Sequence, residues 1–131
     1  MSPTRSPSVR RVLMVDDEPA LLDGFRIAFK RAGWPVATSG SFEDARKKLL
    51  EEKFDVLITD VRLGPFNGLQ LAIIARDRDP EVGIIVFSGY DDPVLQAEAA
   101  HLGAHYLVKP VGFDQLLEAI ESLKPGPKPA P

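Results

Sequence analysis

The sequence contains no cysteine, so disulfide bonds and metal sites built from thiolates are both excluded. It also contains no apolar run approaching the roughly 18 residues that a helix needs to cross a bilayer. The N-terminal residues MSPTRSPSVRR are positively charged but are not followed by a hydrophobic segment, so we expect no secretory signal peptide there. We therefore expect a cytoplasmic protein without a membrane partner.

An excess of positive charge is also absent. The 16 lysine and arginine residues are outnumbered by 19 aspartate and glutamate residues, which gives a formal net charge of -3. Surfaces that bind nucleic acids usually show a basic excess, so we expect no direct nucleic-acid binding by this chain. With 131 residues, the chain is long enough for one domain with a hydrophobic core and too short for two.

Proline is distributed unevenly along the chain. Pro3 and Pro7 lie near the N-terminus, and four further prolines alternate with other residues in the C-terminal segment KPGPKPAP. Proline-rich segments of this kind favour extended conformations without a packed core. The sequence therefore predicts a disordered arm over residues 1–8, a domain over residues 9–123, and a proline-rich tail or linker over residues 124–131.

Five short apolar runs recur within this domain and predict five β-strands. Their residues are continuous rather than alternating in polarity, as expected for parallel strands covered on both faces. The runs comprise residues 12–15, 36–38, 56–59, 84–87 and 106–108.

Segments with helical spacing of apolar residues separate these strands. The first segment has Pro19 at a position suited to a first helical turn and ends at Gly33. Its apolar stripe is formed by Leu21, Phe25, Ala28 and Ala32. Strict alternation of strands and helices predicts an α/β fold with a doubly wound, five-stranded parallel sheet and helices on both faces. Five strands suit the flavodoxin-like order 2-1-3-4-5, in which ligands bind beyond the carboxyl ends of the strands.

Polar residues follow the strands at this edge of the predicted sheet. Asp16 and Asp17 follow the first strand, Asp60 the third, Ser88 the fourth, and Lys109 the fifth. Two carboxylates about 5 Å apart repel each other by roughly 3 kcal/mol at an effective dielectric constant of about 20, so the cluster needs a strong cationic partner. Clustered carboxylates suit Mg²⁺, which binds through one or two carboxylates together with a phosphate. The sequence therefore predicts a magnesium site that also accommodates a phosphate.

These five residues, in this order on these strands, resemble the site of the receiver domain of two-component response regulators. The resemblance covers nearly all of residues 11–123. It implies that Asp60 is the phosphoacceptor, which takes a phosphoryl group from a histidine kinase or a phosphotransfer protein. Such a domain is a signalling phosphoacceptor and not an enzyme with a turnover substrate, because it catalyses at most its own phosphorylation and slow dephosphorylation.

The resemblance also implies roles for the surrounding residues. Asp17 would bind Mg²⁺ directly, Asp16 would bind it mainly through water, and Asp60 and the backbone carbonyl of Arg62 would be further ligands. Ser88 would bind the phosphoryl oxygens, and Lys109 would pair with Asp60 before transfer and with the phosphoryl group afterwards. The Lys109-Pro110 peptide bond would be cis.

The resemblance further implies a switch. Ser88 and Tyr106 would couple the site to the face formed by the fourth helix, the fifth strand and the fifth helix. That face would signal to a partner or an output domain. We also expect it to form a homodimer interface, because the fourth helix has a weak apolar stripe and the fifth strand lies at an exposed edge of the predicted sheet. The chain is then either a single-domain regulator or the receiver domain of a longer protein.

Two segments depart from the family pattern. Leu63, Gly64 and Pro65 stand where a methionine-proline-glycine turn is usual, and Gly89 and Tyr90 replace the common alanine and small residue after Ser88. The second departure predicts altered access of water to the phosphoryl group.

Three other functions remain open from the residues alone. An aspartyl-phosphate hydrolase usually carries an Asp-x-Asp nucleophile on the first strand, and this chain has an adjacent aspartate pair there. A nucleotide or flavin binder would need a glycine-rich phosphate loop after that strand, and none is present. A receiver-like module that only binds partners would not need the complete acidic set. We expect no chemistry from His101 or His105, which lack ligand spacing.

Overall fold

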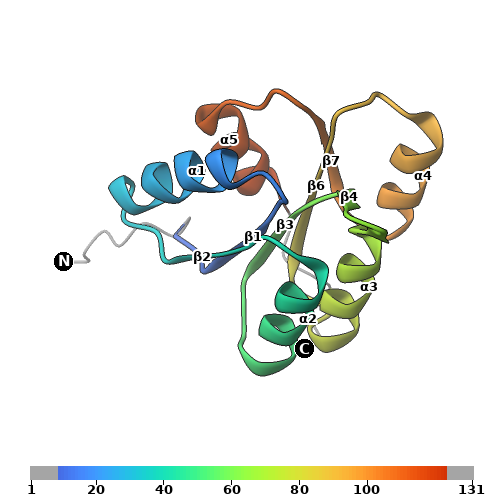
Figure 1. Cartoon of the computed structure of the whole chain (residues 1–131), viewed down its shortest axis with the longest axis horizontal. Coiled ribbons are helices and arrows are strands. Elements are labelled where there is room, and N and C mark those ends of the chain that lie inside the picture. The colour runs from blue at the N-terminus through green and yellow to red at the C-terminus, as the bar shows by residue number, and fades with distance from the viewer. Residues whose placement is uncertain (1–8, 124–131) are drawn as a thin grey trace, which may run out of the picture.

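A computed structural model describes residues 9–123, and its five main strands follow the strands expected from the sequence (Figure 1). The arm and the tail expected at residues 1–8 and 124–131 lie outside the described residues. The elements, in chain order, are β1 (Val12–Val15), α1 (Pro19–Arg31), β2 (Val36–Ser39), α2 (Phe42–Glu51), β3 (Val56–Asp60), β4 (Arg62–Leu63), β5 (Phe66–Asn67), α3 (Leu69–Arg78), β6 (Gly83–Ser88), α4 (Pro93–His101), β7 (His105–Val108) and α5 (Phe113–Ser122).

The main sheet has five parallel strands in the order β2-β1-β3-β6-β7. This order is the expected flavodoxin-like order 2-1-3-4-5, because β6 and β7 are the fourth and fifth strands of the main sheet. The prediction of the fold class is therefore confirmed. None of the helices described over residues 9–123 is both long enough and apolar enough to cross a membrane.

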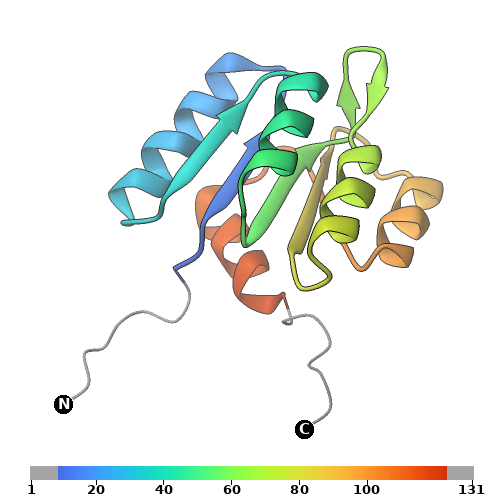
Figure 2. The same cartoon turned by 90° about the horizontal axis from the view of Figure 1, so that it is seen from below.

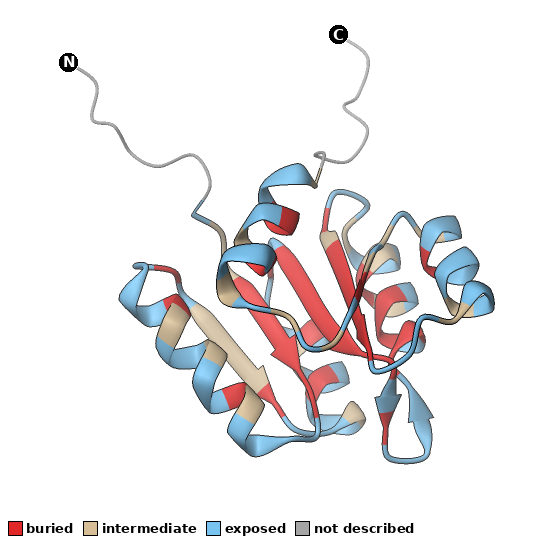
Figure 3. Cartoon of the chain, turned by 90° about the horizontal axis from the view of Figure 1, so that it is seen from above, coloured by how far each residue is buried: buried red, intermediate tan, exposed pale blue. Residues whose placement is uncertain are grey.

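The helices form a layer on each face of the sheet, as Figures 1 and 2 show. One core joins α1 and α5 to the sheet, with Phe29 and Ile120 fully buried in it. The other core joins α2, α3 and α4 to the opposite face, with Leu57 and Leu71 at its centre. Every residue of β1 and β3 is buried, which explains why β1 and the part of β3 up to Ile58 are continuously apolar (Figure 3).

Local sequence signals set several helix boundaries. Pro19 occupies the first turn of α1, and Gly33 adopts a positive φ of 82° just beyond the end of that helix. The Oγ of Ser41 accepts the backbone N–H of Asp44 at 3.2 Å and so caps the start of α2. The buried residues of α1 are Leu22 and Phe29, whereas Ala32, which the sequence placed in the apolar stripe, is exposed.

A short antiparallel hairpin of β4 and β5 follows β3, and the sequence did not predict it. Its turn contains Gly64, whose φ is 61°, a value that favours glycine. The ring of Phe66 stacks on that of Phe42 in α2, with 4.7 Å between their centroids. The hairpin therefore projects from the carboxyl edge of the sheet and is braced against α2 (Figures 2 and 3).

Candidate functional site

Three carboxylates meet at the carboxyl edge of the main sheet. Asp16 follows β1 and Asp60 ends β3, and these strands are neighbours because Val15 pairs with Thr59. One oxygen each of Asp16, Asp17 and Asp60 lies within 4.8 Å of the others. Asp16 is 1% exposed and Asp60 8% exposed, whereas Asp17 is open to solvent. The structure thus brings together the three aspartates that the sequence placed at this edge.

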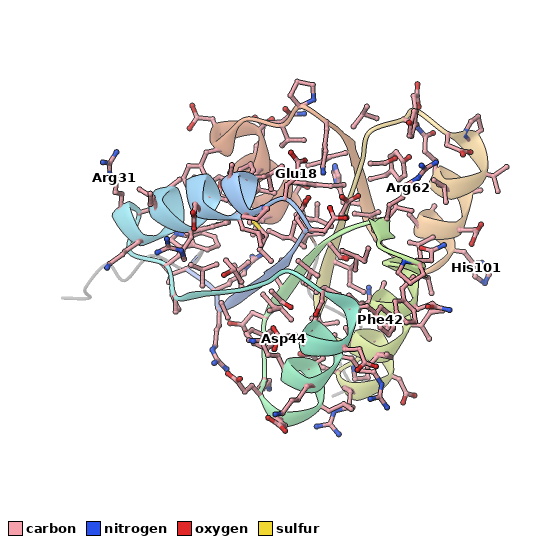
Figure 4. The ribbon with its side chains drawn as sticks, in the orientation of Figure 1. Glu18, Arg31, Phe42, Asp44, Arg62 and His101 are labelled. Atoms are coloured by element: carbon pink, nitrogen blue, oxygen red, sulfur yellow. The ribbon has the colours of Figure 1, made fainter. Side chains whose placement is uncertain are left out.

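Lys109 supplies a positive charge to this cluster. Its Nζ donates to Oδ2 of Asp16 at 2.8 Å and to Oδ2 of Asp60 at 3.0 Å, and lies 3.7 Å from Oε1 of Glu18. The backbone N–H of Lys109 donates to the carbonyl of Ser88 at 2.8 Å, which fixes the lysine next to β6. The Lys109-Pro110 bond is cis, as the resemblance implied. Figure 4 shows Glu18, at the start of α1, beside this edge of the sheet.

The backbone around Asp60 holds its carboxylate in place. Its Oδ1 accepts the N–H of Arg62 at 3.2 Å. The carbonyl oxygen of Asp60 accepts the Oγ1–H of Thr59 at 2.9 Å and faces Gly68. A Cβ added to Gly68 would lie 1.8 Å from that oxygen, so only glycine fits there. Sequence reasoning missed Gly68, although the Asn-Gly pair before an apolar helical segment was a visible turn signal.

Burial and neighbouring charges shift two pKa values in this cluster. Burial raises the pKa of Asp60, and the negative charge of Asp16 raises it further. The hydrogen bonds from Lys109 and the Arg62 amide act in the opposite direction without cancelling the increase. Burial alone would lower the pKa of Lys109, but its hydrogen bonds to Asp16 and Asp60 outweigh burial and raise it.

The chemistry of the cluster fits a hard divalent cation. Three carboxylate oxygens within 4.8 Å of one another carry more negative charge than the single ammonium of Lys109 neutralises. Mg²⁺ prefers oxygen ligands and keeps several of its waters. The cluster suits Mg²⁺ because Asp17 is exposed, which leaves room for those waters.

A second group of residues links the hairpin, the loop after β6, and β7. The buried Oγ of Ser88 accepts the N–H of Tyr90 at 3.1 Å. The hydroxyl of Tyr106 donates to the carbonyl of Tyr90 at 2.6 Å. The guanidinium of Arg62 lies 5.1 Å from the centre of the Tyr90 ring, which is itself 60% exposed. The sequence named Arg62, Ser88 and Tyr106 separately, and the structure adds that Tyr90 connects them.

The two histidines lie outside this arrangement. His101 and His105 are exposed on α4 and β7, and neither belongs to the carboxylate cluster found within the described residues. Figure 4 shows His101 on the outer side of α4, on the far side of Arg62 from Glu18.

A doubly wound sheet with an aspartate cluster and a lysine at its carboxyl edge defines the class of receiver-type α/β domains. The chain matches the response regulator receiver domain family over residues 12–121. It therefore belongs to this family, and the resemblance seen in the sequence is confirmed. Family membership favours a receiver domain over the hydrolase and over the nucleotide or flavin binder.

Individual relatives agree with this assignment. The chain is 36% identical over 114 residues to the alginate biosynthesis transcriptional regulatory protein AlgB of Pseudomonas aeruginosa, a match covering 86% of this chain and 25% of AlgB. The chain thus spans about a quarter of the length of the curated relatives it matches.

Two solved structures share the fold. A CheY-like receiver domain protein from Methanospirillum hungatei is 28% identical with a TM-score of 0.81, and the match covers 86% of this chain and 91% of that one. A response regulator from Burkholderia pseudomallei, solved with a phosphorylated aspartic acid, a calcium ion and citrate, gives the same identity and TM-score, covering 86% of this chain and 67% of that one.

Proposed function

We propose that this receiver domain accepts a phosphoryl group on Asp60 from a histidine kinase or a phosphotransfer protein in a Mg²⁺-dependent reaction. The observation that carries the proposal is the position of the Asp60 carboxylate. It is oriented by the Arg62 amide at 3.2 Å and by Lys109 at 3.0 Å, within 4.8 Å of the other aspartates. The solved relative with a phosphorylated aspartic acid supports the same chemistry.

The transfer needs a carboxylate nucleophile that is held in line with the donor. An oxygen of Asp60 attacks phosphorus, the P–N bond of the donor phosphohistidine breaks, and the imidazole keeps that electron pair and takes up a proton. The product on Asp60 is an acyl phosphate. A rigid strand end suits this role because small errors in orientation slow a positioned reaction strongly.

The remaining residues neutralise charge on the transferred group. Asp17 and Asp60, with Asp16 acting through water and the backbone carbonyl of Arg62, would hold Mg²⁺. When bound, Mg²⁺ supplies positive charge to the phosphoryl oxygens. Lys109 stays close enough to Asp60 to follow the new phosphoryl group, and Ser88 donates its hydroxyl to one of the oxygens.

The switch reaches a signalling face through Ser88 and Tyr106. Once Ser88 turns toward a phosphoryl oxygen, its bond to the Tyr90 amide is lost and the loop carrying the Tyr90 carbonyl is free to shift. That carbonyl is the acceptor of the Tyr106 hydroxyl. The face formed by α4, β7 and α5 would then change its affinity for a partner, an output domain or a second copy of the chain.

Labelling with acetyl phosphate tests the acceptor. Intact-mass analysis of the protein with acetyl phosphate and Mg²⁺ should show one added phosphoryl group, which is lost in Asp60→Asn and in EDTA. Asp23→Asn is the matched control, because Asp23 is an exposed aspartate on α1 and should leave labelling unchanged. Labelling that survives in Asp60→Asn would overturn the assignment.

A further inference from the structure

The core holds α4 less firmly than the other described helices. One residue of α4, Ala99, is buried, whereas each of the other four helices buries at least two residues. Val94 in its first turn is 66% exposed. Figures 1 and 2 show α4 at the outer edge of the molecule beside α3. Contacts at the two ends of α4 therefore contribute much of what fixes its position.

The N-terminal end of α4 is tied to the candidate site. Asp92 caps the helix by accepting the N–H of Val94 at 2.9 Å. Only three residues separate Asp92 from Ser88, and within them Tyr90 bonds to Ser88 and to Tyr106. Ser88 is thus connected to this end of the helix by a short, hydrogen-bonded loop.

The C-terminal end of α4 finishes in a Schellman turn. The N–H of Gly103 donates to Ala100 at 2.9 Å and that of Ala104 donates to Ala99 at 2.8 Å, while Gly103 adopts a φ of 73°. These bonds satisfy carbonyls inside the helix. The carbonyls of Leu102 and Gly103, which lie beyond the helix, need donors from elsewhere.

The guanidinium of Arg76 in α3 provides those donors. Its Nη2 donates to the carbonyl of Leu102 at 3.0 Å and to that of Gly103 at 3.5 Å. Its Nη1 donates to the carbonyl of Val82 at 2.6 Å and to that of Pro80 at 3.0 Å. Val82 immediately precedes β6, the buried strand that ends at Ser88. One planar fork therefore joins the C-terminal turn of α4 to the base of β6.

We propose that Arg76 is a positioning residue of the switch, which fixes the C-terminal end of α4 so that a change at Ser88 moves mainly its N-terminal end. The inference rests on the proposed function for its trigger, but the anchor itself is a property of the unphosphorylated protein. A nine-residue helix is about 13 Å long, so a small rotation about a fixed C-terminal end displaces the N-terminal end most. Arginine suits this role because its rigid fork reaches carbonyls on two sides at once.

Hydrogen exchange without metal or phosphate tests the anchor. In Arg76→Met, which keeps an apolar stem but loses the four hydrogen bonds, the amides of Gly103 and Ala104 should exchange about tenfold faster or more, the effect of losing one charge-assisted hydrogen bond. The amides of β1 report global unfolding, so the acceleration at Gly103 must exceed theirs. Arg78→Met is the matched control on the same helix, because Arg78 donates to Leu50 in α2 and not to α4. Equal exchange at Gly103 in Arg76→Met and wild type would overturn the proposal.

A second comparison adds Mg²⁺ and beryllofluoride, a phosphoryl mimic. In the wild type, exchange should change at Val94 and Leu95 and stay within twofold at Gly103 and Ala104. In Arg76→Met the change should extend to Gly103. Equal changes in exchange at both ends of α4 in the wild type would contradict the proposal that its C-terminal end stays fixed. If the wild type does not respond to the mimic, the proposed phosphoacceptor function fails, and the metal-free comparison still decides whether Arg76 anchors α4.

Discussion

Replacing Asp60 with asparagine is expected to stabilise the metal-free protein, because the negative charge on this buried side chain is poorly compensated. At an effective dielectric constant of about 20, its attraction to Lys109 at 3.0 Å is about 5.5 kcal/mol, and its repulsion from a carboxylate 4.8 Å away is about 3.5 kcal/mol. Asp17 is exposed and its repulsion is screened, so these contributions nearly cancel and burial of the charge decides the sign. Asparagine keeps Oδ1 as an acceptor for the Arg62 amide. We expect a gain of about 1–2 kcal/mol in the free energy of unfolding at pH 7.

The pH dependence of this gain follows from the raised pKa of Asp60. A carboxyl whose pKa is higher in the folded than in the unfolded protein contributes stability that is fully present below its ordinary value of 3.8. That contribution is lost as the pH rises through the raised folded value. The advantage of Asp60→Asn over the wild type should therefore grow as the pH rises from 3.8 through that value, and should be small below 3.8.

Urea unfolding in EDTA, followed by the fluorescence of the single tryptophan, measures the effect. Trp34 is buried against Phe29, so its emission reports loss of the α1–α5 core. Saturating Mg²⁺ should reverse the order of stability, because a site that binds only the folded protein adds about 2.7 kcal/mol at 100 times the dissociation constant. Lys109→Met is the control of opposite sign and should destabilise the protein in EDTA. An Asp60→Asn protein that is no more stable than the wild type at pH 7 would refute the reasoning.

Three further predictions concern the surroundings of the site. Arg62→Ala and Tyr90→Ala should each change the dephosphorylation rate with little change in Mg²⁺ affinity, since the two residues lie two positions beyond Asp60 and Ser88 and their side chains contact each other at 5.1 Å. Unchanged decay of the labelled protein in the double variant would count against this. Gly68→Ala should slow labelling by acetyl phosphate at least tenfold and lower the melting temperature, because the added Cβ would lie 1.8 Å from the Asp60 carbonyl oxygen and force that carbonyl to move. Normal labelling would contradict this expectation. Tyr106→Phe, which loses the hydroxyl bonded to the Tyr90 carbonyl, should leave labelling intact while altering exchange of the β6–α4 loop with beryllofluoride.

The order of elements and the identity of the acidic cluster could be read from the sequence. Continuous apolar runs mark strands buried on both faces, and a parallel sheet places the carboxyl ends of those strands at one edge. Asp16, Asp17, Asp60 and Lys109 were therefore predictable as neighbours once the strands were assigned. Local signals such as Pro19 and Gly33 also located the ends of the first helix, because such signals depend on residues only a few positions apart.

Features that depend on contacts between distant segments were decided only by the tertiary structure. β4 and β5 have only two residues each, which is too short for a periodic pattern in the sequence to predict their pairing. The position of Phe66 depends on its stacking on Phe42 in α2. The burial of Leu22 in place of Ala32 on α1 depends on the sheet and α5 beneath that helix. Arg76 reaches Leu102 across 26 positions of sequence, and nothing in its neighbours distinguishes it from an exposed arginine such as Arg78. Periodicity reports which face of an element is buried, whereas the partners of a long polar side chain are fixed only when the elements pack.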